Sequence, residues 1–103
     1  MARALLIANP AAARTRHVLV RSIERVFNAR GWRVETLATS GPGDARRLAA
    51  WGVESGVDVV LVLGGDGTIM QAAAAMVGTG VPLGVLPGGT GNQLVGNLRL
   101  SFN

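Results

Sequence analysis

The pattern of hydrophobic and polar positions along this 103-residue chain predicts short strands that alternate with helices. Asp58 to Leu63 is apolar after its first residue and shows no alternation, which is typical of a strand buried on both faces of a parallel sheet. The predicted strands are Ala4 to Ala8, Trp32 to Thr39, Asp58 to Leu63 and Val81 to Leu86, and the predicted helices are Thr15 to Arg30, Ala45 to about Ser55, Ile69 to Val77 and a segment from Gln93 to Leu100. This order predicts an α/β fold in three layers: a doubly wound parallel sheet of about four strands, with helices on both faces and right-handed crossovers.

Glycines and polar residues mark the ends of these helices. Gly31 and Gly56 are the predicted stops of the first two helices, and Asp44 and Thr68 are the predicted N-caps of the second and third. Gly52 argues against the second helix, since glycine lowers helix propensity. The side chains expected to face the sheet are Leu48 and Val53 with Trp51 or Ala49 in the second helix, and Ile69, Ala72, Ala73, Met76 and Val77 in the third.

A glycine-rich turn, Gly64-Gly65-Asp66-Gly67-Thr68, follows the most apolar strand. We expect its glycines to adopt positive φ and to let backbone N–H groups approach a ligand closely. The turn would direct the positive end of the next helix at an anion, which makes it a candidate phosphate site. A purely structural turn between strand and helix is an equally good interpretation of this single motif.

A second glycine turn, Pro87 to Asn92, follows the next strand. Strand carboxyl ends share one edge of a parallel sheet, so both turns are expected to face the same crevice. Asn9-Pro10 and Thr39 end the first two strands at that edge, where Asn9 either contacts a ligand or only forms a turn. A strand order with the first strand between the second and third, and the fourth outside, would place Asn9 next to Asp66. The chain has no lysine and therefore no Walker A loop, and it has no G-x-G-x-x-G after its first strand.

Composition narrows the function classes further. The chain is 49% hydrophobic and has no cysteine, which indicates one compact domain without disulfides or thiolate metal sites. Its net charge of +4 comes from dispersed arginines with few aromatic residues between them, a pattern that argues against nucleic acid as a partner and suits an anionic substrate or membrane surface. No apolar run has the length of roughly 20 residues that a membrane span needs, and the first residues do not read as a signal peptide. A cytoplasmic location is the default expectation.

The four strand ends together resemble a known family. Asn9-Pro10, Thr39, Gly64 to Thr68 and Pro87 to Asn92 match, in order and spacing, the catalytic domain of the diacylglycerol kinase superfamily, which includes bacterial lipid kinases and sphingosine and ceramide kinases. The shared GGDGT element makes this group distantly similar to NAD kinases and phosphofructokinases. The resemblance covers essentially the whole chain and corresponds to the N-terminal, nucleotide-binding half of family members.

The resemblance implies a site for ATP and Mg²⁺. Asp66 would lie beside the phosphates and help to organise magnesium, through water, and Thr90 would contact the nucleotide from the last turn. The nucleotide-binding residues implied by the family are Asn9, Pro10, Thr39, Gly64, Gly65, Asp66, Gly67, Thr68, Gly88, Gly89, Thr90, Gly91 and Asn92. The implied reaction transfers the γ-phosphate of ATP to a lipid hydroxyl at a membrane surface, so the full-length protein would be cytoplasmic or peripheral to the membrane.

The sequence also departs from the family pattern. Met70-Gln71 stands where the family usually has Asn-Glu, and Gln93 stands where it often has aspartate. Family members continue into a mostly β domain that supplies the general base, magnesium ligands and much of the lipid site. We therefore expect residues 1–103 to be the ATP-binding half, with no catalytic base, no activity alone, an exposed apolar surface, a loosely held tail after Asn92 and a tendency to self-associate. A NAD-kinase-like small-molecule kinase and a non-catalytic nucleotide-binding scaffold are the alternatives.

Overall fold

A computed structural model describes residues 1–9, 13–87 and 99–101. Its elements are β1 (Arg3–Ala8), α1 (Ala13–Ala29), β2 (Arg33–Ala38), α2 (Asp44–Glu54), β3 (Val59–Gly64), α3 (Asp66–Met76), β4 (Leu83–Pro87) and β5 (Arg99–Ser101). The four predicted strands and the first three predicted helices are present in the expected order. Among the described residues, no helix is both long and apolar enough to cross a membrane.

The sheet has the strand order β2-β1-β3-β4-β5. β2, β1, β3 and β4 are parallel to their neighbours, which confirms the predicted order of the first four strands. β5 pairs antiparallel with β4, with Leu100 opposite Gly84. The predicted helix from Gln93 to Leu100 is therefore wrong at its end, where the open edge of β4 offers unpaired backbone groups and the chain forms a strand instead; residues 93–98 lie outside the described residues.

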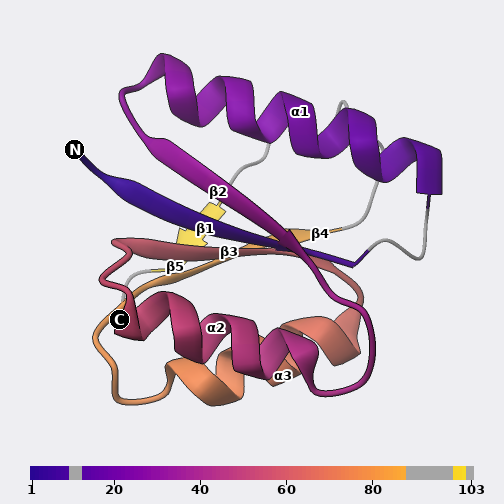
Figure 1. Cartoon of the computed structure of the whole chain (residues 1–103), viewed down its shortest axis with the longest axis vertical. Helices are drawn as coiled ribbons and strands as arrows, with labels where there is room; N and C mark the ends of the chain where they lie inside the picture. Colours follow the sequence, from indigo (N-terminus) through magenta and orange to yellow (C-terminus); the bar gives the residue numbers. More distant parts are fainter. Residues whose placement is uncertain (10–12, 88–98, 102–103) are drawn as a thin grey trace.

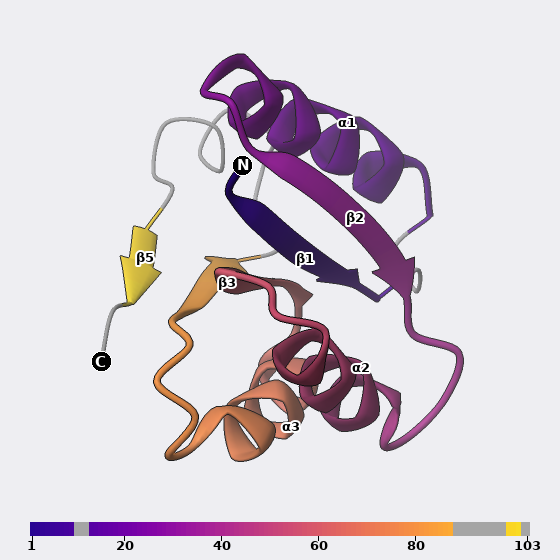
Figure 2. The same cartoon turned by 60° about the vertical axis from the view of Figure 1, so that its left-hand side comes forward.

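Helices cover both faces of the sheet, as predicted. Figure 1 shows α1 on one face and α2 and α3 on the other, and Figure 2 shows α2 and α3 side by side. The two central strands, β1 and β3, have no alternation of polar residues because each face is covered. Leu6 and Leu61 pack with α1, whereas Leu5 and Val60 pack on the α2 and α3 side, and all four are fully buried.

Glycine marks both the ends of the helices and a close contact. Gly31 (φ 84°) and Gly56 (φ 85°) follow α1 and α2 in the left-handed conformation, which confirms the two predicted stops. Gly52 lies inside α2, and a Cβ built on it would come within 2.6 Å of Leu5 Cδ2. The residue that argued against the helix is thus the one that lets the helix approach the sheet.

Two sequence expectations about helix faces are settled by the structure. Of the two alternatives in α2, Ala49 faces the sheet, at 0% exposure, whereas Trp51 is 42% exposed. Val77 was expected against the sheet but is 82% exposed, because α3 ends at Met76 and the chain then turns through Gly78 and Gly80, both with positive φ. The tail after Asn92 lies largely outside the described residues.

Candidate functional site

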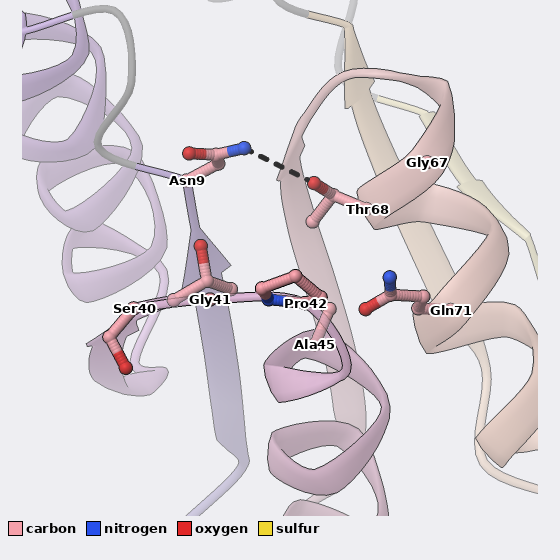
Figure 3. A pocket seen from close by; sticks show the side chains of 9 residues that line it. Asn9, Ser40, Gly41, Pro42, Ala45, Gly67, Thr68 and Gln71 are labelled. Carbon is pink, nitrogen blue, oxygen red and sulfur yellow. Dashed lines mark hydrogen bonds between the residues drawn. The ribbon is translucent and has the colours of Figure 1, made fainter.

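A pocket of about 540 Å³ opens at the carboxyl edge of the parallel strands. It lies between the ends of β1 and β2 and the first turns of α2 and α3 (Figure 3). The residues that line it are Asn9, Thr39, Ser40, Gly41, Pro42, Ala45, Gly67, Thr68 and Gln71. The sequence predicted a crevice at this edge that both glycine turns face; the pocket includes Gly67 and Thr68 of the first turn, and the second turn lies outside the described residues.

The backbone ladder continues past β1 and positions Asn9. The backbone N–H of Asn9 donates to Leu63 O at 3.1 Å, and the N–H of Thr39 donates to Ala8 O at 3.0 Å. From this position the Asn9 side chain points at α3, and its Nδ2 donates to Thr68 Oγ1 at 3.4 Å (Figure 3). The predicted strand order thus brings Asn9 to the turn that carries Asp66 and Thr68.

The turn after β3 is tighter than the sequence analysis expected. β3 ends at Gly64 and α3 begins at Asp66, so Gly65 is the single residue between them and acts as the N-cap. The prediction of Thr68 as N-cap is wrong, because Thr68 already lies inside the helix; Ile69 N–H donates to Gly65 O at 3.0 Å.

The prediction of positive φ in this turn is also wrong. Gly65 has φ −84° and ψ −178°, an extended conformation that any residue can adopt, and neither Gly64 nor Gly67 has positive φ. Space is what these glycines provide. A Cβ on Gly64 would lie 3.0 Å from Thr68 Cβ, so Gly64 admits the Thr68 side chain beside the strand. Gly65 and Gly67 face open space, which leaves their backbone accessible.

Two helix N-termini meet at the pocket. Ala45 belongs to the first turn of α2, and Gly67 and Thr68 belong to the first turn of α3. The first N–H groups of a helix have no partner within the helix and carry partial positive charge, so each of these starts favours an anion. Asn9, Thr39 and Gln71 add neutral polar groups around the same space, with Gln71 extending from α3 toward Pro42 (Figure 3). The pocket suits a polyanion that needs hydrogen bonds from several directions.

The second aspartate of interest, Asp44, is not an N-cap as the sequence suggested. It is the first residue of α2, Gly43 is the N-cap with φ 86°, and the Asp44 carboxylate accepts hydrogen bonds from Ser40. The five-residue loop between β2 and α2 explains the difference, because it brings Ser40 N–H and Oγ to the carboxylate.

The predicted site residues divide into three groups. Asn9, Thr39, Gly67 and Thr68 line the pocket, whereas Gly64, Gly65 and Asp66 lie in the same turn but do not line it. Pro10 and the residues of the second glycine turn, Gly88, Gly89, Thr90, Gly91 and Asn92, lie outside the described residues.

Magnesium fits this site only when it binds together with a ligand that supplies phosphate oxygens. Asp66 is an exposed carboxylate at the start of α3, beside the pocket residues Gly67 and Thr68. Within the part of the chain that the structure describes, no group of three or more His, Cys, Asp or Glu residues could hold a metal ion. Mg²⁺ usually keeps several waters and binds through one or two carboxylates plus phosphate oxygens, so one carboxylate at this position is compatible with it.

Sequence reasoning missed five residues of the pocket. Ser40, Gly41 and Pro42 belong to the loop between β2 and α2, to which the sequence analysis gave no role, and Ala45 lies in the first turn of α2. Gln71 was noted only as a departure from the family pattern. Its position five residues after Asp66, in the second turn of a helix that starts at the pocket, is the signal that could have assigned it.

Comparisons with known proteins agree with this architecture. The family model described as "Diacylglycerol kinase catalytic domain" matches residues 3–102. A protein named "Diacylglycerol kinase" from Mycobacterium tuberculosis is 44% identical over 64 residues, which cover 62% of this chain and 21% of that protein. A "Probable lipid kinase YegS-like" from Cronobacter sakazakii is 34% identical over 79 residues, 73% of this chain and 26% of that protein.

Solved structures point the same way. A crystal structure of a diacylglycerol kinase from Bacillus anthracis str. Sterne superposes with a TM-score of 0.69 at 30% identity, over 84% of this chain and 34% of that one. The chain thus spans a fifth to about a third of the length of these relatives. From the match over nearly its whole length, we conclude that this chain belongs to the family of the diacylglycerol kinase catalytic domain.

Proposed function

We propose that this chain is the ATP-binding half of a lipid kinase that transfers the γ-phosphate of ATP to a lipid hydroxyl of the diacylglycerol type. The observation that carries the proposal is the convergence of two helix N-termini, Asn9 and Thr39 on one pocket at the carboxyl edge of the sheet. Relatives named as kinases support a phosphoryl-transfer reaction. The protein would work in the cytoplasm and reach its acceptor at a membrane surface.

In this proposal the chain binds and orients the nucleotide. The first N–H groups of α3 and the open backbone of Gly65 and Gly67 hold the phosphates, and Asn9, Thr39 and Gln71 position the rest of the nucleotide. No lysine or arginine lines the described pocket, so the phosphate charge needs a further cation. Magnesium supplies that charge when it is bound with the nucleotide, and Asp66 is the residue that would hold it, directly or through water.

The described pocket contains no residue that can accept the proton of a lipid hydroxyl. Its side chains are amides, hydroxyls, Pro42, Ala45 and glycines, and none is a carboxylate or a histidine. A general base has to lie within hydrogen-bond reach of the proton it removes. We therefore propose that the base belongs to a further part of a longer protein and that these residues alone bind nucleotide without turning over.

A NAD-kinase-like function is the second candidate, and one comparison favours it. An "NAD kinase" from Nitratidesulfovibrio vulgaris is 51% identical over 43 residues, although these cover only 42% of this chain. Both candidates bind ATP and differ in the acceptor. Competition separates them, because NAD would bind the second candidate and not the first.

The test of the proposed function is a calorimetric titration of the chain with Mg-ATP and, separately, with NAD. We expect saturable binding of Mg-ATP, weakened about tenfold by Thr68→Ala, because loss of one hydrogen bond and of the side chain that fixes Asn9 amounts to roughly 1.4 kcal/mol. Thr79→Ala is the matched control: the same substitution beyond the opposite end of α3, where Thr79 Oγ1 donates to Met76 O at 2.7 Å. Absence of saturable Mg-ATP binding to the folded chain would contradict the proposal.

A further inference from the structure

We propose that Asp44 is a positioning residue of the nucleotide pocket, although it does not line the pocket itself. It holds the loop from Thr39 to Gly43 in the shape that forms one wall. This inference rests on the proposed function and adds to it a residue outside the implied nucleotide contacts. Asp44 acts through other residues, and no contact between its carboxylate and the nucleotide is required.

The Asp44 carboxylate gathers the loop onto the start of α2. Ser40 donates twice to Asp44 Oδ2, from its backbone N–H at 2.6 Å and from its Oγ at 2.6 Å. The other oxygen, Oδ1, pairs with the Arg47 guanidinium one turn along the helix. The N–H of Asp44 in turn donates to Gly41 O at 3.2 Å, which closes the loop in the opposite direction.

Burial makes these bonds matter. Asp44 is 6% exposed, and it is the one charged residue that is buried in the part of the chain that the structure describes. A buried carboxylate is tolerated only when its oxygens are satisfied, and hydrogen bonds to a charged group are stronger than neutral ones. The carboxylate and the loop therefore require one another: without Asp44, the Ser40 N–H loses its acceptor, and without Ser40, the carboxylate loses two donors.

The loop forms the pocket wall between two fixed points. At one end the Thr39 N–H donates to Ala8 O and continues the sheet, and at the other end Asp44 ties Ser40 to α2. Ser40, Gly41 and Pro42, which line the pocket, lie between Thr39 and Asp44 along the chain. Two glycines in five residues give this segment large conformational freedom when it is not held. Asp44 removes that freedom before a ligand arrives, which lowers the cost of binding.

The first arm of the test reads the loop without any ligand. Backbone ¹⁵N order parameters of Ser40, Gly41 and Gly43 are expected to be about 0.85 in the wild-type chain and below roughly 0.6 in Asp44→Ala. Amides of β1 and β3 are expected to keep their values, which shows that the variant is folded. Unchanged order parameters in the loop would overturn the proposal.

The second arm measures the dissociation constant for Mg-ATP. If the population of the binding-competent loop falls to a tenth in Asp44→Ala, the apparent dissociation constant rises about tenfold. Asp44→Asn keeps the side-chain size and one acceptor oxygen and is expected to lie between wild type and Asp44→Ala. Arg46→Ala is the control, since Arg46 is the neighbouring exposed arginine of the same helix and its removal leaves the contacts of Asp44 in place; it is expected to bind within about twofold of wild type.

The two arms keep the two proposals apart. A loosened loop with unchanged Mg-ATP affinity would show that Asp44 orders the loop for stability alone, and it would overturn the positioning role. A wild-type chain that binds no Mg-ATP contradicts the proposed function and, with it, the role of Asp44 in nucleotide binding. In that case the order parameters still report whether Asp44 holds the loop.

Discussion

The dipeptide Gly-Asp begins both helices that meet at the pocket, in two different environments. In α2, Gly43 is the N-cap in the left-handed conformation and Asp44 is buried, bonded to Ser40 and paired with Arg47. In α3, Gly65 is the N-cap in an extended conformation and Asp66 is exposed. The same residue type at the same helix position therefore has a structural task in one case and is available to a ligand in the other.

The connection that precedes each helix explains the contrast. β2 ends at Ala38 and five residues lead to Asp44, enough for a loop that folds back onto the carboxylate. β3 ends at Gly64, and Gly65 alone leads to Asp66, so no neighbouring segment can cover this carboxylate from the same connection. The longer connection, between β2 and α2, forms a wall of the pocket. The shorter one, between β3 and α3, leaves the N-terminus of α3 open toward the pocket.

The largest expected effect separates the two aspartates by stability. Asp44→Ala should lower the free energy of unfolding by about 2 kcal/mol, because it removes charge-assisted hydrogen bonds and leaves the Ser40 N–H without its acceptor. Asp66→Ala should lower it by no more than about 1 kcal/mol, the scale of an exposed charge at a helix N-terminus. Urea unfolding of both variants measures the difference, and equal losses would show that the two environments are energetically alike.

The two N-cap glycines, Gly43 and Gly65, are expected to give a smaller difference in stability. Gly43→Ala should cost about 1 kcal/mol, since a Cβ is disfavoured at φ 86°. Gly65→Ala should leave stability within about 0.5 kcal/mol, because its backbone is extended and a Cβ would meet nothing within 4 Å. The same unfolding experiment tests both; a destabilised Gly65→Ala would mean that the turn after β3 is strained in a way its dihedral angles do not reveal.

Much of the fold was predictable from the hydrophobic pattern. The unbroken run of apolar residues in β3 predicted a central strand, and it is buried on both faces. The antiparallel β5 was not predictable, because its three residues carry little pattern and pair only where the edge of β4 is available. Gly52 wrongly argued against α2. Helix propensity is a local property, whereas the close approach of Gly52 to Leu5 is a tertiary contact.

The site was predictable at the strand ends and less so in the helices. Asn9 and Thr39 could be placed because parallel strands end at one edge, and both line the pocket. The roles of the two aspartates could not be separated, because burial of Asp44 depends on a hydrogen bond to Ser40 that no spacing rule encodes. The N-cap of α3 was predicted at Thr68, about one turn too late, because no residue pattern indicates that Gly65 alone would precede the helix.

The most direct test of this account is the magnesium dependence of ATP binding in Asp44→Ala and Asp66→Ala. Calorimetric titrations with ATP, with and without Mg²⁺, give the affinity gain from magnesium in each variant. We expect Asp44→Ala to bind more weakly but to keep the full magnesium gain, and Asp66→Ala to lose most of it, because Asp66 is the one of the two that would face the metal. A full magnesium gain in Asp66→Ala would contradict the assignment of Asp66 to the metal and, with it, the functional difference between the two helix starts.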